Sequence, residues 1–268
     1  MNDERYNLTV LLTSHCTLKC KLCATYTPYI VNPHHYSYEI ITKSVDRFFS
    51  SMGSVNLFTL GGGEPFLHPQ LPELLESFSK WTPQCNKFEI TTNGTVIPND
   101  VVLQQLSQMN KVDILIDNYG PKLSTKVPEI CAAFERNGIQ FRVRDYYSEN
   151  AHCGGWTDSS VFKDKQHSEL ESEQLFARCE FKGGVEVLTK LVILVDGMAF
   201  MCYNNHKLVP WIQKKEEEYV DMLNERITDE EIKHGIKSLR DRKSLSACAY
   251  CNGYVYNSVR YPAAEQLT

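Results

Sequence analysis

The stretch NLTVLLTSHCTLKCKLC, residues 7–23, joins an apolar run to three closely spaced cysteines. Its first seven residues are rich in leucine, valine and threonine and have the length of a buried strand. Cys16, Cys20 and Cys23 follow in a CxxxCxxC pattern. We therefore expect a strand over 7–13 that delivers three thiols into the loop at its carboxyl end.

Similar apolar runs recur along the first half of the chain, separated by helical candidates. The expected strands are 55–60, 87–92, 112–117 and 139–146, and the expected helices are 38–51, 70–80, 99–109 and 124–137. Strands that alternate with helices indicate a parallel sheet built from right-handed βαβ units. The predicted fold class is α/β, with a partial (β/α)6-type parallel barrel.

Distinctive short motifs follow several of these strands. GGGEP comes after the strand at 55–60, TNG after the strand at 87–92, and DNYG closes the strand at 112–117. In parallel barrels the functional site lies at the carboxyl ends of the strands. The alternative is that the glycines only make turns.

Composition narrows the class of protein. The chain has 268 residues, a formal net charge of -5 and scattered basic residues, which do not favour a nucleic-acid partner. It has neither an apolar run of the ~18 residues that a membrane span needs nor a signal-peptide opening. We expect a cytoplasmic protein with a small-molecule substrate. Ten cysteines in a reducing compartment favour metal or redox chemistry over disulfides.

Three thiolates at the spacing of Cys16, Cys20 and Cys23 can hold an iron-sulfur cube and leave its fourth iron open. Zinc is the competing ligand. It needs four donors, and the fourth candidate, His15, is awkwardly adjacent to Cys16. Simple burial of the cysteines is a further alternative.

After residue 147 the alternation ends, and a long loop leads to a helix expected at 165–177. Short antiparallel strands should then turn at Asp196 and Gly197, followed by charged helices at 213–225 and 228–242. We expect two domains, 1–165 and 166–268, the second a small α+β unit. Its cysteines, Cys179, Cys202, Cys248 and Cys251, suit a second cluster or a structural zinc. Cys85 and Cys131 are expected to be packing residues.

CxxxCxxC after the first strand, GGEP after the second and TNG after the third together resemble the radical S-adenosylmethionine (SAM) superfamily over residues 7–146. The resemblance implies a [4Fe-4S] cluster on the three cysteines, SAM on the open iron, and reductive cleavage to a 5′-deoxyadenosyl radical. It also implies reduced flavodoxin or ferredoxin as the electron donor.

The resemblance further suggests roles for the motif residues. Gly62 and Gly63 would admit the methionine amine, Glu64 would balance its charge, and Thr92, Asn93 and Asp117 would bind ribose or carboxylate oxygens. Leu22 would lie near the adenine, where the family usually has an aromatic residue.

The second half resembles the Twitch extension, a shortened SPASM domain with an auxiliary [4Fe-4S] cluster on four cysteines. In length and layout the chain resembles the aminocyclitol dehydrogenases of butirosin biosynthesis. The implied function is hydrogen abstraction from a sugar or aminocyclitol-like molecule and two-electron oxidation of an alcohol, with the auxiliary cluster accepting an electron.

Two further residues are candidates for the chemistry. Cys153, in a glycine-rich loop, has a thiol that can return a hydrogen atom, which would make an epimerase. Arg144 ends the strand at 139–146 and suits an anion or a hydroxyl, although a plain salt bridge is the alternative. Weaker substrate candidates are His152, Trp156, Asp158, Tyr26 and Tyr29. The remaining alternatives are modification of a ribosomal peptide and a non-catalytic metal-binding module.

Overall fold

The computed structural model describes residues 5–158, 164–182, 189–206, 216–255 and 257–268. Its centre is one eight-stranded sheet in the order β5-β4-β3-β2-β1-β7-β8-β9. The first five strands are β1 (Arg5–Thr13), β2 (Val55–Gly62), β3 (Cys85–Thr92), β4 (Val112–Asn118) and β5 (Phe141–Asp145). They pair in parallel, which confirms the expected mixed α/β fold with a large parallel sheet.

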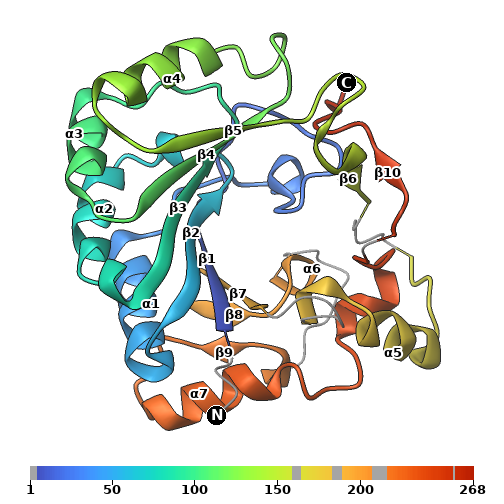
Figure 1. Cartoon of the computed structure of the whole chain (residues 1–268). Helices are drawn as coiled ribbons and strands as arrows, with labels where there is room; N and C mark the ends of the chain where they lie inside the picture. The colour runs from blue at the N-terminus through green and yellow to red at the C-terminus, as the bar shows by residue number, and fades with distance from the viewer. Residues whose placement is uncertain (1–4, 159–163, 183–188, 207–215, 256) are drawn as a thin grey trace.

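Four helices cover the outer face of these strands (Figure 1). They are α1 (Tyr38–Met52), α2 (Leu71–Ser79), α3 (Asp100–Gln108) and α4 (Val127–Arg136). Each lies close to its expected range because its apolar residues recur at helical spacing. In α2, Leu71, Leu74, Leu75 and Phe78 form one buried stripe.

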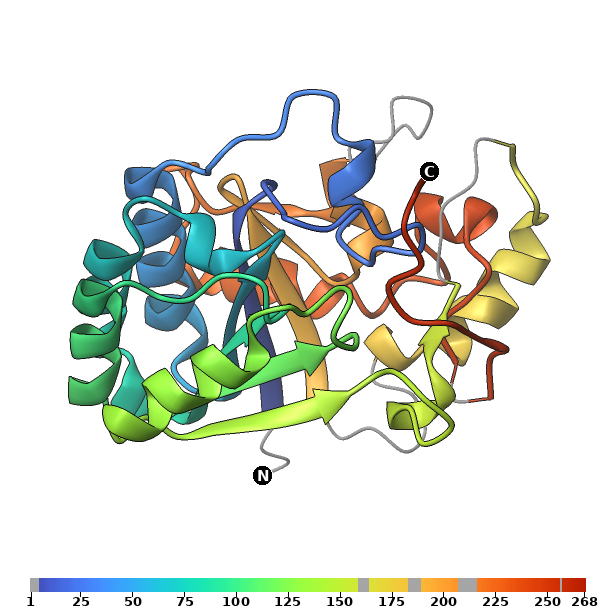
Figure 2. The same cartoon turned by 90° about the horizontal axis from the view of Figure 1, so that it is seen from above.

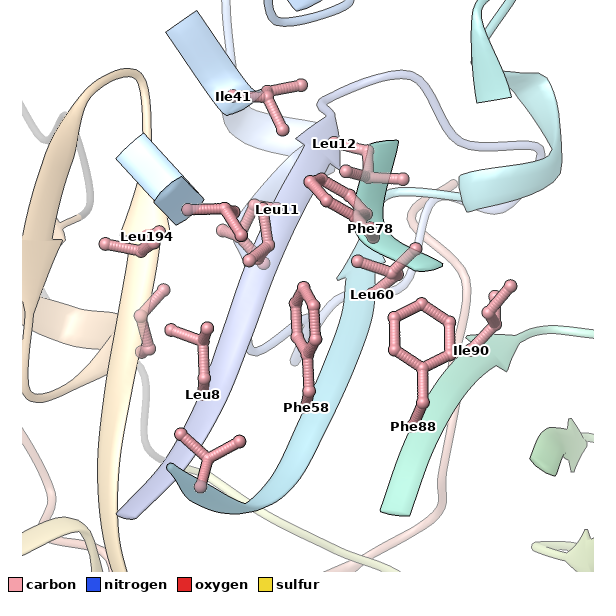
Figure 3. Close-up of a cluster of buried hydrophobic side chains, with 14 of the residues drawn as sticks. Leu8, Leu11, Leu12, Ile41, Phe58, Leu60, Phe78, Phe88, Ile90 and Leu194 are labelled. Atoms are coloured by element: carbon pink, nitrogen blue, oxygen red, sulfur yellow. The ribbon is translucent and has the colours of Figure 1, made fainter. Parts of the chain in front are cut away.

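The core fills the space between the sheet and these helices (Figure 3). Phe58 is fully buried and contacts the rings of Phe49, Phe78 and Phe88 at centroid separations of 5.4, 5.4 and 4.9 Å. Burying one such side chain stabilises the fold by about 1.5–3 kcal/mol. Because strand side chains alternate between faces, the neighbouring Thr59 and Glu89 point to the opposite face of the sheet.

The second half of the chain extends the same sheet. β7 (Thr189–Val195) pairs in parallel with β1, and β8 (Met198–Phe200) and β9 (Val220–Asp221) follow in antiparallel order. The expected turn at Asp196 and Gly197 is confirmed, with φ of 48° and 79°. Strands from both sides of residue 165 share one sheet. The predicted division into two domains at this residue stays a prediction.

The remaining helices are α5 (Glu169–Ala177), α6 (Tyr203–His206) and α7 (Asp229–Ser238), and a separate ribbon pairs β6 (Trp156–Thr157) with β10 (Arg260–Tyr261). α7 packs against α1, whereas α5 and the ribbon lie on the opposite side of the molecule from α2 and α3 (Figure 2). Short 3-10 turns occupy Thr27–Tyr29, Pro65–Leu67, Thr82–Gln84, His152–Gly154, Glu180–Lys182, Glu216–Glu218 and Ser246–Tyr250. No helix in the described ranges is both long and apolar enough to span a membrane.

The helix expected at 213–225 is wrong where the structure describes it. Residues 216–218 form a 3-10 turn and Val220–Asp221 a strand, while 213–215 lie outside the described residues. The charged sequence suggested an exposed helix, but Val220 and Met222 are buried and Asp221 is exposed. This alternation of buried and exposed side chains is the period-two pattern of a strand, and the strand pairs with β8 at the edge of the sheet.

Candidate functional site

The cysteine loop begins where β1 ends and is held against the glycine-rich end of β2. Gly63 N donates to Thr13 O at 2.7 Å, and Glu64 N donates to His15 O at 2.8 Å. A Cβ on Gly62 would lie 2.5 Å from Thr13 O, and one on Gly63 would lie 2.0 Å from His15 O. The close approach of these two segments therefore requires glycine at both positions.

Cys16, Cys20 and Cys23 all line a cavity of about 530 Å³. Each sulfur has a hydrogen-bond partner. Asn93 Nδ2 donates to Cys16 at 3.5 Å and Gln266 Nε2 donates to Cys20 at 3.4 Å, while Cys23 Sγ lies 3.2 Å from Thr25 Oγ1, whose hydroxyl donates to Gly62 O. Burial raises the pKa of Cys16 to about 11 and that of Cys20 to about 12. Metal binding at these thiols would therefore release protons.

The donor set fits an iron-sulfur cube better than a single ion. Within the described residues, no group of three or more His, Cys, Asp or Glu side chains is arranged to hold one metal ion. A four-iron cube spaces its thiolates more widely than a single ion does, so this finding concerns mononuclear sites. The three thiols also face a common cavity with room beyond them, as a cube with an open iron needs.

Glu64 lies behind the wall of the cavity, and it is not among the described lining residues. Its side chain is fully buried and accepts hydrogen bonds from Thr92 Oγ1 and Asn93 N, both at 2.9 Å, and from Phe66 N at 3.3 Å. Burial raises the pKa of Glu64 to about 7. The carboxylate thus shapes the turn that presents Thr92 and Asn93 to the cavity.

Asp117 and Arg144 meet across adjacent strands, because the β4–β5 register places them side by side. Arg144 Nε and Nη2 donate to the two carboxylate oxygens of Asp117 at 2.8 and 3.0 Å. Burial raises the pKa of Asp117 to about 6, although Arg144 opposes that rise. Both residues line the cavity, and the expected alternative of a salt bridge for Arg144 is present.

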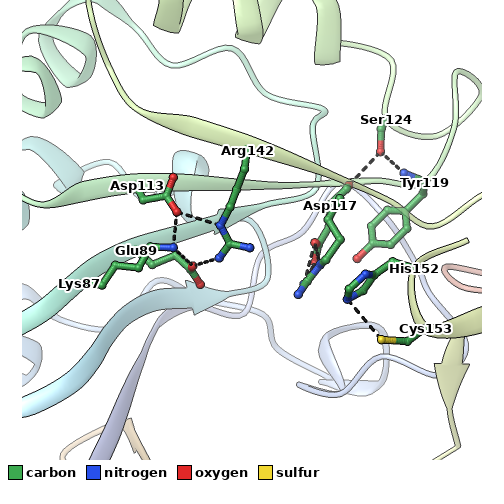
Figure 4. Close-up of polar contacts among 10 residues, drawn as sticks. Lys87, Glu89, Asp113, Asp117, Tyr119, Ser124, Arg142, His152 and Cys153 are labelled. Carbon is green, nitrogen blue, oxygen red and sulfur yellow. Dashed lines mark hydrogen bonds and ion pairs between the residues drawn. The ribbon is translucent and has the colours of Figure 1, made fainter.

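A second charged group extends along the inner face of β3, β4 and β5 (Figure 4). Arg142 donates to Glu89 and, at 2.9 Å, to Asp113, while Lys87 pairs with both carboxylates. Only Glu89 of this group is among the described lining residues. The neighbouring strand threonines, Thr9, Thr59 and Thr91, also line the cavity, so its floor is polar.

Aromatic side chains form another part of the cavity wall. Tyr119 and Tyr146 have centroids 5.7 Å apart, and Trp156 meets Tyr119 edge to face at 5.4 Å. His152 meets Tyr146 edge to face at 5.4 Å, and its Nε2 lies 3.4 Å from Cys153 Sγ (Figure 4). Cys153 is exposed, has a φ of 53° and lines the cavity.

Most residues predicted from sequence therefore meet at one cavity. The lining includes Cys16, Cys20, Leu22, Cys23, Gly62, Gly63, Thr92, Asn93, Asp117, Arg144, His152, Cys153 and Trp156. Tyr26, Tyr29, Glu64 and Asp158 are not among the described lining residues. Sequence reasoning missed Tyr119, Tyr146 and Gln266. Tyr119 follows Asp117 closely in the DNYG motif, which was a usable signal, but nothing local pointed to Gln266.

The second cysteine group lines a separate apolar cavity. Cys179, Cys202, Cys248 and Cys251 all lie on its wall, beside Leu175, Phe176 and Met201. Asn205 N donates to Cys202 Sγ at 3.3 Å, and Asn204 Nδ2 donates to Cys251 Sγ at 2.7 Å. Burial raises the pKa of Cys248 to about 12 and that of Cys202 well above its ordinary value. The four soft donors thus converge on one apolar cavity.

Comparison with known proteins was informative for the first half of the chain. Residues 10–135 match the family model described as Radical SAM superfamily, in agreement with the resemblance expected for this part of the chain. The family implies a [4Fe-4S] cluster and SAM at this domain. The GTP 3',8-cyclase of Syntrophomonas wolfei is 28% identical over 42% of this chain and 34% of its own length. GTP 3',8-cyclase 1 of Mycobacterium tuberculosis is 25% identical over 64% of this chain and 48% of its own.

A solved structure covers the whole chain. The crystal structure of BtrN in complex with AdoMet and 2-DOIA aligns over 100% of both chains, with a TM-score of 0.59 and 14% identity. At this identity the likeness concerns the fold. The chain spans between a third and a half of the length of the two curated relatives named above.

Proposed function

We propose that the radical SAM domain of residues 10–135 is the catalytic part of an oxidoreductase that acts on an alcohol of a sugar or aminocyclitol-like molecule. The observation that carries this proposal is that the cysteine loop, the strand-end motifs, the Asp117–Arg144 pair and Cys153 line one cavity. Its volume of about 530 Å³ lies in the range of small-molecule sites.

The SAM end of the cavity consists of the cysteine loop, the glycine backbone of β2 and the turn after β3. Cys16, Cys20 and Cys23 would hold the cluster, which with bound SAM supplies the 5′-deoxyadenosyl radical. Gly62 and Gly63 offer backbone atoms on the cavity wall, and Thr92 and Asn93 offer side-chain polar atoms. Glu64 would act by fixing that turn, because its oxygens accept hydrogen bonds from Thr92 and Asn93. Leu22 offers the adenine an aliphatic surface.

The substrate end combines a polar edge with an aromatic wall. Nε and Nη2 of Arg144 bind Asp117, so other guanidinium N–H groups are left to face a substrate oxygen. Tyr119, Tyr146 and Trp156 provide flat apolar surfaces for the C–H face of a ring. A cyclic polyol or aminocyclitol has both kinds of surface. This match supports the substrate class.

The residues also suit the proton transfer that oxidation requires. An alcohol that becomes a carbonyl loses one hydrogen atom from carbon, one proton from oxygen and one electron. Arg144 cannot accept the proton because guanidinium groups remain protonated. The Asp117 carboxylate, with its pKa raised to about 6 by burial, is the nearby base.

The electron needs an acceptor, and we propose an auxiliary [4Fe-4S] cluster on Cys179, Cys202, Cys248 and Cys251. Four thiols around one apolar cavity match the ligand number of such a cluster. A structural zinc is the competing occupant, although no group of three or more His, Cys, Asp or Glu side chains in the described residues is arranged to hold a single metal ion. The auxiliary-cluster domain, the boundary at residue 165 and a flavodoxin or ferredoxin donor all belong to this proposal.

The first experiment is anaerobic iron and sulfide loading followed by reduction with dithionite in the presence of SAM. We expect 5′-deoxyadenosine by mass spectrometry, and none from the triple variant in which Cys16, Cys20 and Cys23 are alanine. A panel of aminocyclitols and sugars then tests for a product two mass units lighter. A fully loaded protein that never releases 5′-deoxyadenosine would refute the proposal.

A second candidate is a radical epimerase in which Cys153 returns a hydrogen atom to the substrate. Its support is that Cys153 is exposed and lines the same cavity. Turnover in deuterated water distinguishes the two reactions, because a thiol exchanges its hydrogen with solvent. A product of unchanged oxidation state that carries deuterium supports the epimerase, whereas an unlabelled ketone supports the dehydrogenase.

Three other functions have less support from the cavity. The curated relatives are named GTP 3',8-cyclase, but the cationic residues among the described lining residues are Arg144 and Arg260, few for a triphosphate. GTP belongs in the substrate panel as the direct test. Modification of a ribosomal peptide would show as turnover of a peptide instead. A non-catalytic metal-binding module would bind iron or zinc and leave SAM intact.

A further inference from the structure

A segment from the far end of the sequence lies against the cysteine loop (Figure 2). Lys21 N donates to Glu265 O at 2.7 Å, and Leu267 N donates to Lys19 O at 2.8 Å. These bonds flank an antiparallel bridge between Cys20 and Gln266. Residues 264–267, which we call the clasp segment, thus fix the backbone around the middle cysteine.

The side chain of Gln266 adds contacts that this backbone pairing does not require. Its Nε2 donates to Cys20 Sγ at 3.4 Å and to Ala264 O at 2.7 Å. Its Oε1 accepts from Lys19 N at 2.8 Å. All three contacts hold the amide in one orientation, with an N–H directed at the sulfur. Cys20 is the buried member of the three cysteines, so protein groups dominate its surroundings.

We propose that Gln266 is a positioning residue that raises the reduction potential of the [4Fe-4S] cluster at Cys16, Cys20 and Cys23 by donating a hydrogen bond to Cys20. The inference rests on the proposed function, because it presumes that this cluster is present. Its physical basis is that reduction adds negative charge to the cluster and its thiolates. An N–H directed at a ligand sulfur stabilises that charge, and hydrogen bonds to sulfur are among the factors that set cluster potentials.

Gln266→Glu removes both contacts that Nε2 makes, to Cys20 Sγ and to Ala264 O, and keeps the contact with Lys19 N. The carboxylate keeps an oxygen for Lys19 N, but it replaces the N–H facing Cys20 with a negative oxygen. Gln266→Met removes the donor without adding charge. Losing a hydrogen bond to a charged group should change the ratio of reduced to oxidised cluster by about tenfold at a fixed potential. For a one-electron couple this equals a fall of about 59 mV.

The measurement is a redox titration of the iron-loaded protein followed by electron paramagnetic resonance. The signal of interest is the one that changes when SAM is added, which separates this cluster from an auxiliary one. Gln104→Glu adds the same charge at an exposed position on α3. Glu265→Gln removes the ion pair with Lys21 but leaves Gln266 intact. Both controls should keep the potential of the unmodified protein.

An unchanged midpoint potential in both Gln266 variants would overturn the inference and leave the proposed function standing. Loss of the SAM-sensitive cluster from both variants, with the fold intact by circular dichroism, would also overturn it and would indicate a purely structural clasp. Absence of any SAM-sensitive signal from the iron-loaded unmodified protein would refute the proposed function itself.

Discussion

Buried carboxylates shape the candidate site at the scale of single residues. Glu64 has its oxygens engaged by Thr92, Asn93 and Phe66, and Asp117 has both oxygens engaged by Arg144. Removing a partner inside such a group leaves a buried polar atom unsatisfied, which costs more than a typical hydrogen bond contributes. Conservative substitutions at these positions should therefore have measurable effects.

Glu64→Gln should lower the free energy of unfolding by about 1–3 kcal/mol, because one acceptor oxygen becomes an N–H that faces existing donors. Urea unfolding of the anaerobically loaded protein measures the change. Glu76→Gln, at an exposed position on α2, is the matched control and should change little. Equal stability of the two variants would contradict the role assigned to Glu64.

Arg144→Lys should lower substrate oxidation by at least tenfold, since an ammonium group cannot make the two-point contact with Asp117. Formation of 5′-deoxyadenosine without substrate should persist, because the cysteine loop is untouched. Arg142→Lys is the control: it lies on the same strand but binds Glu89 and Asp113 instead. A similar loss in both variants would argue against a special role for Arg144.

Substrate oxidation should fall in acid, because the proposed reaction uses the ionised carboxylate of Asp117 as its base. Burial raises the pKa of this group to about 6, so the carboxylate is largely ionised at pH 7 and progressively protonated below pH 6. At pH 5.5 the rate should be about fourfold below its plateau. Stopped assays with iron content checked at each pH measure the profile, and Asp117→Asn should abolish the step.

Residue roles were only partly predictable from the sequence. The cysteine triplet and the strand-end motifs could be found because each is local. Gln266 could not, because it lies 246 residues from Cys20 and only the fold brings them together. Glu64 was expected to face SAM. The expectation remains untested, but full burial and three donors show that it also serves the protein's own backbone turn.

At the scale of elements, the end of β2 and the cysteine loop pack closely because the glycines at the end of β2 have no side chains. Gly63 leaves room for His15 O, whereas a Cβ on Gly61, two residues earlier, would meet only Thr9 Cγ2 at 3.9 Å. The GGG run therefore contains one position that tolerates a methyl group, Gly61, and two that do not, Gly62 and Gly63.

Gly63→Ala should displace the cysteine loop and lower bound iron by more than half, because the added methyl group collides with backbone that cannot move independently. Gly61→Ala should load iron normally. Iron and sulfide analysis after anaerobic loading compares them. Full loading of Gly63→Ala would show that the loop adapts and that the close approach is not needed.

Helices and strands with a clear period could be predicted closely, as in α2 and β3. The failure at 216–225 has a physical cause: a run of charges resembles an exposed helix, whereas pairing with β8 selected a strand. The parallel pairing of β7 with β1 was also not predicted. It joins residues more than 180 positions apart, and no local pattern encodes such a partner.

At the scale of the whole molecule, two groups of thiols line two cavities, one with a polar floor and an aromatic wall, called the polar cavity here, and one that is almost wholly apolar. If each cavity holds a four-iron cluster, a substitution in one cavity should abolish the function of that cluster and leave the function of the other. The apolar cavity serves electron acceptance in the proposed function, and the polar cavity serves SAM.

Cys202→Ala should reduce iron from about eight to about four atoms per chain, because it removes one ligand of the proposed auxiliary cluster. SAM cleavage should continue while conversion of the alcohol to a carbonyl is lost. Cys131→Ala, on α4, should retain both activities. Zinc in place of iron at this site, with oxidation intact, would contradict the proposed electron acceptor.

The inner position of β1 has a consequence for how the chain is made. β1 leaves the ribosome early and can pair with β2 soon afterwards, but its other edge waits for β7. At about 5–20 residues per second, synthesis of the roughly 180 intervening residues takes roughly 10–40 s. Throughout that time the nascent chain carries an open strand edge, a ready template for misassembly with its neighbours. The rate of translation of the residues between β1 and β7 therefore sets how long the nascent chain is prone to aggregation.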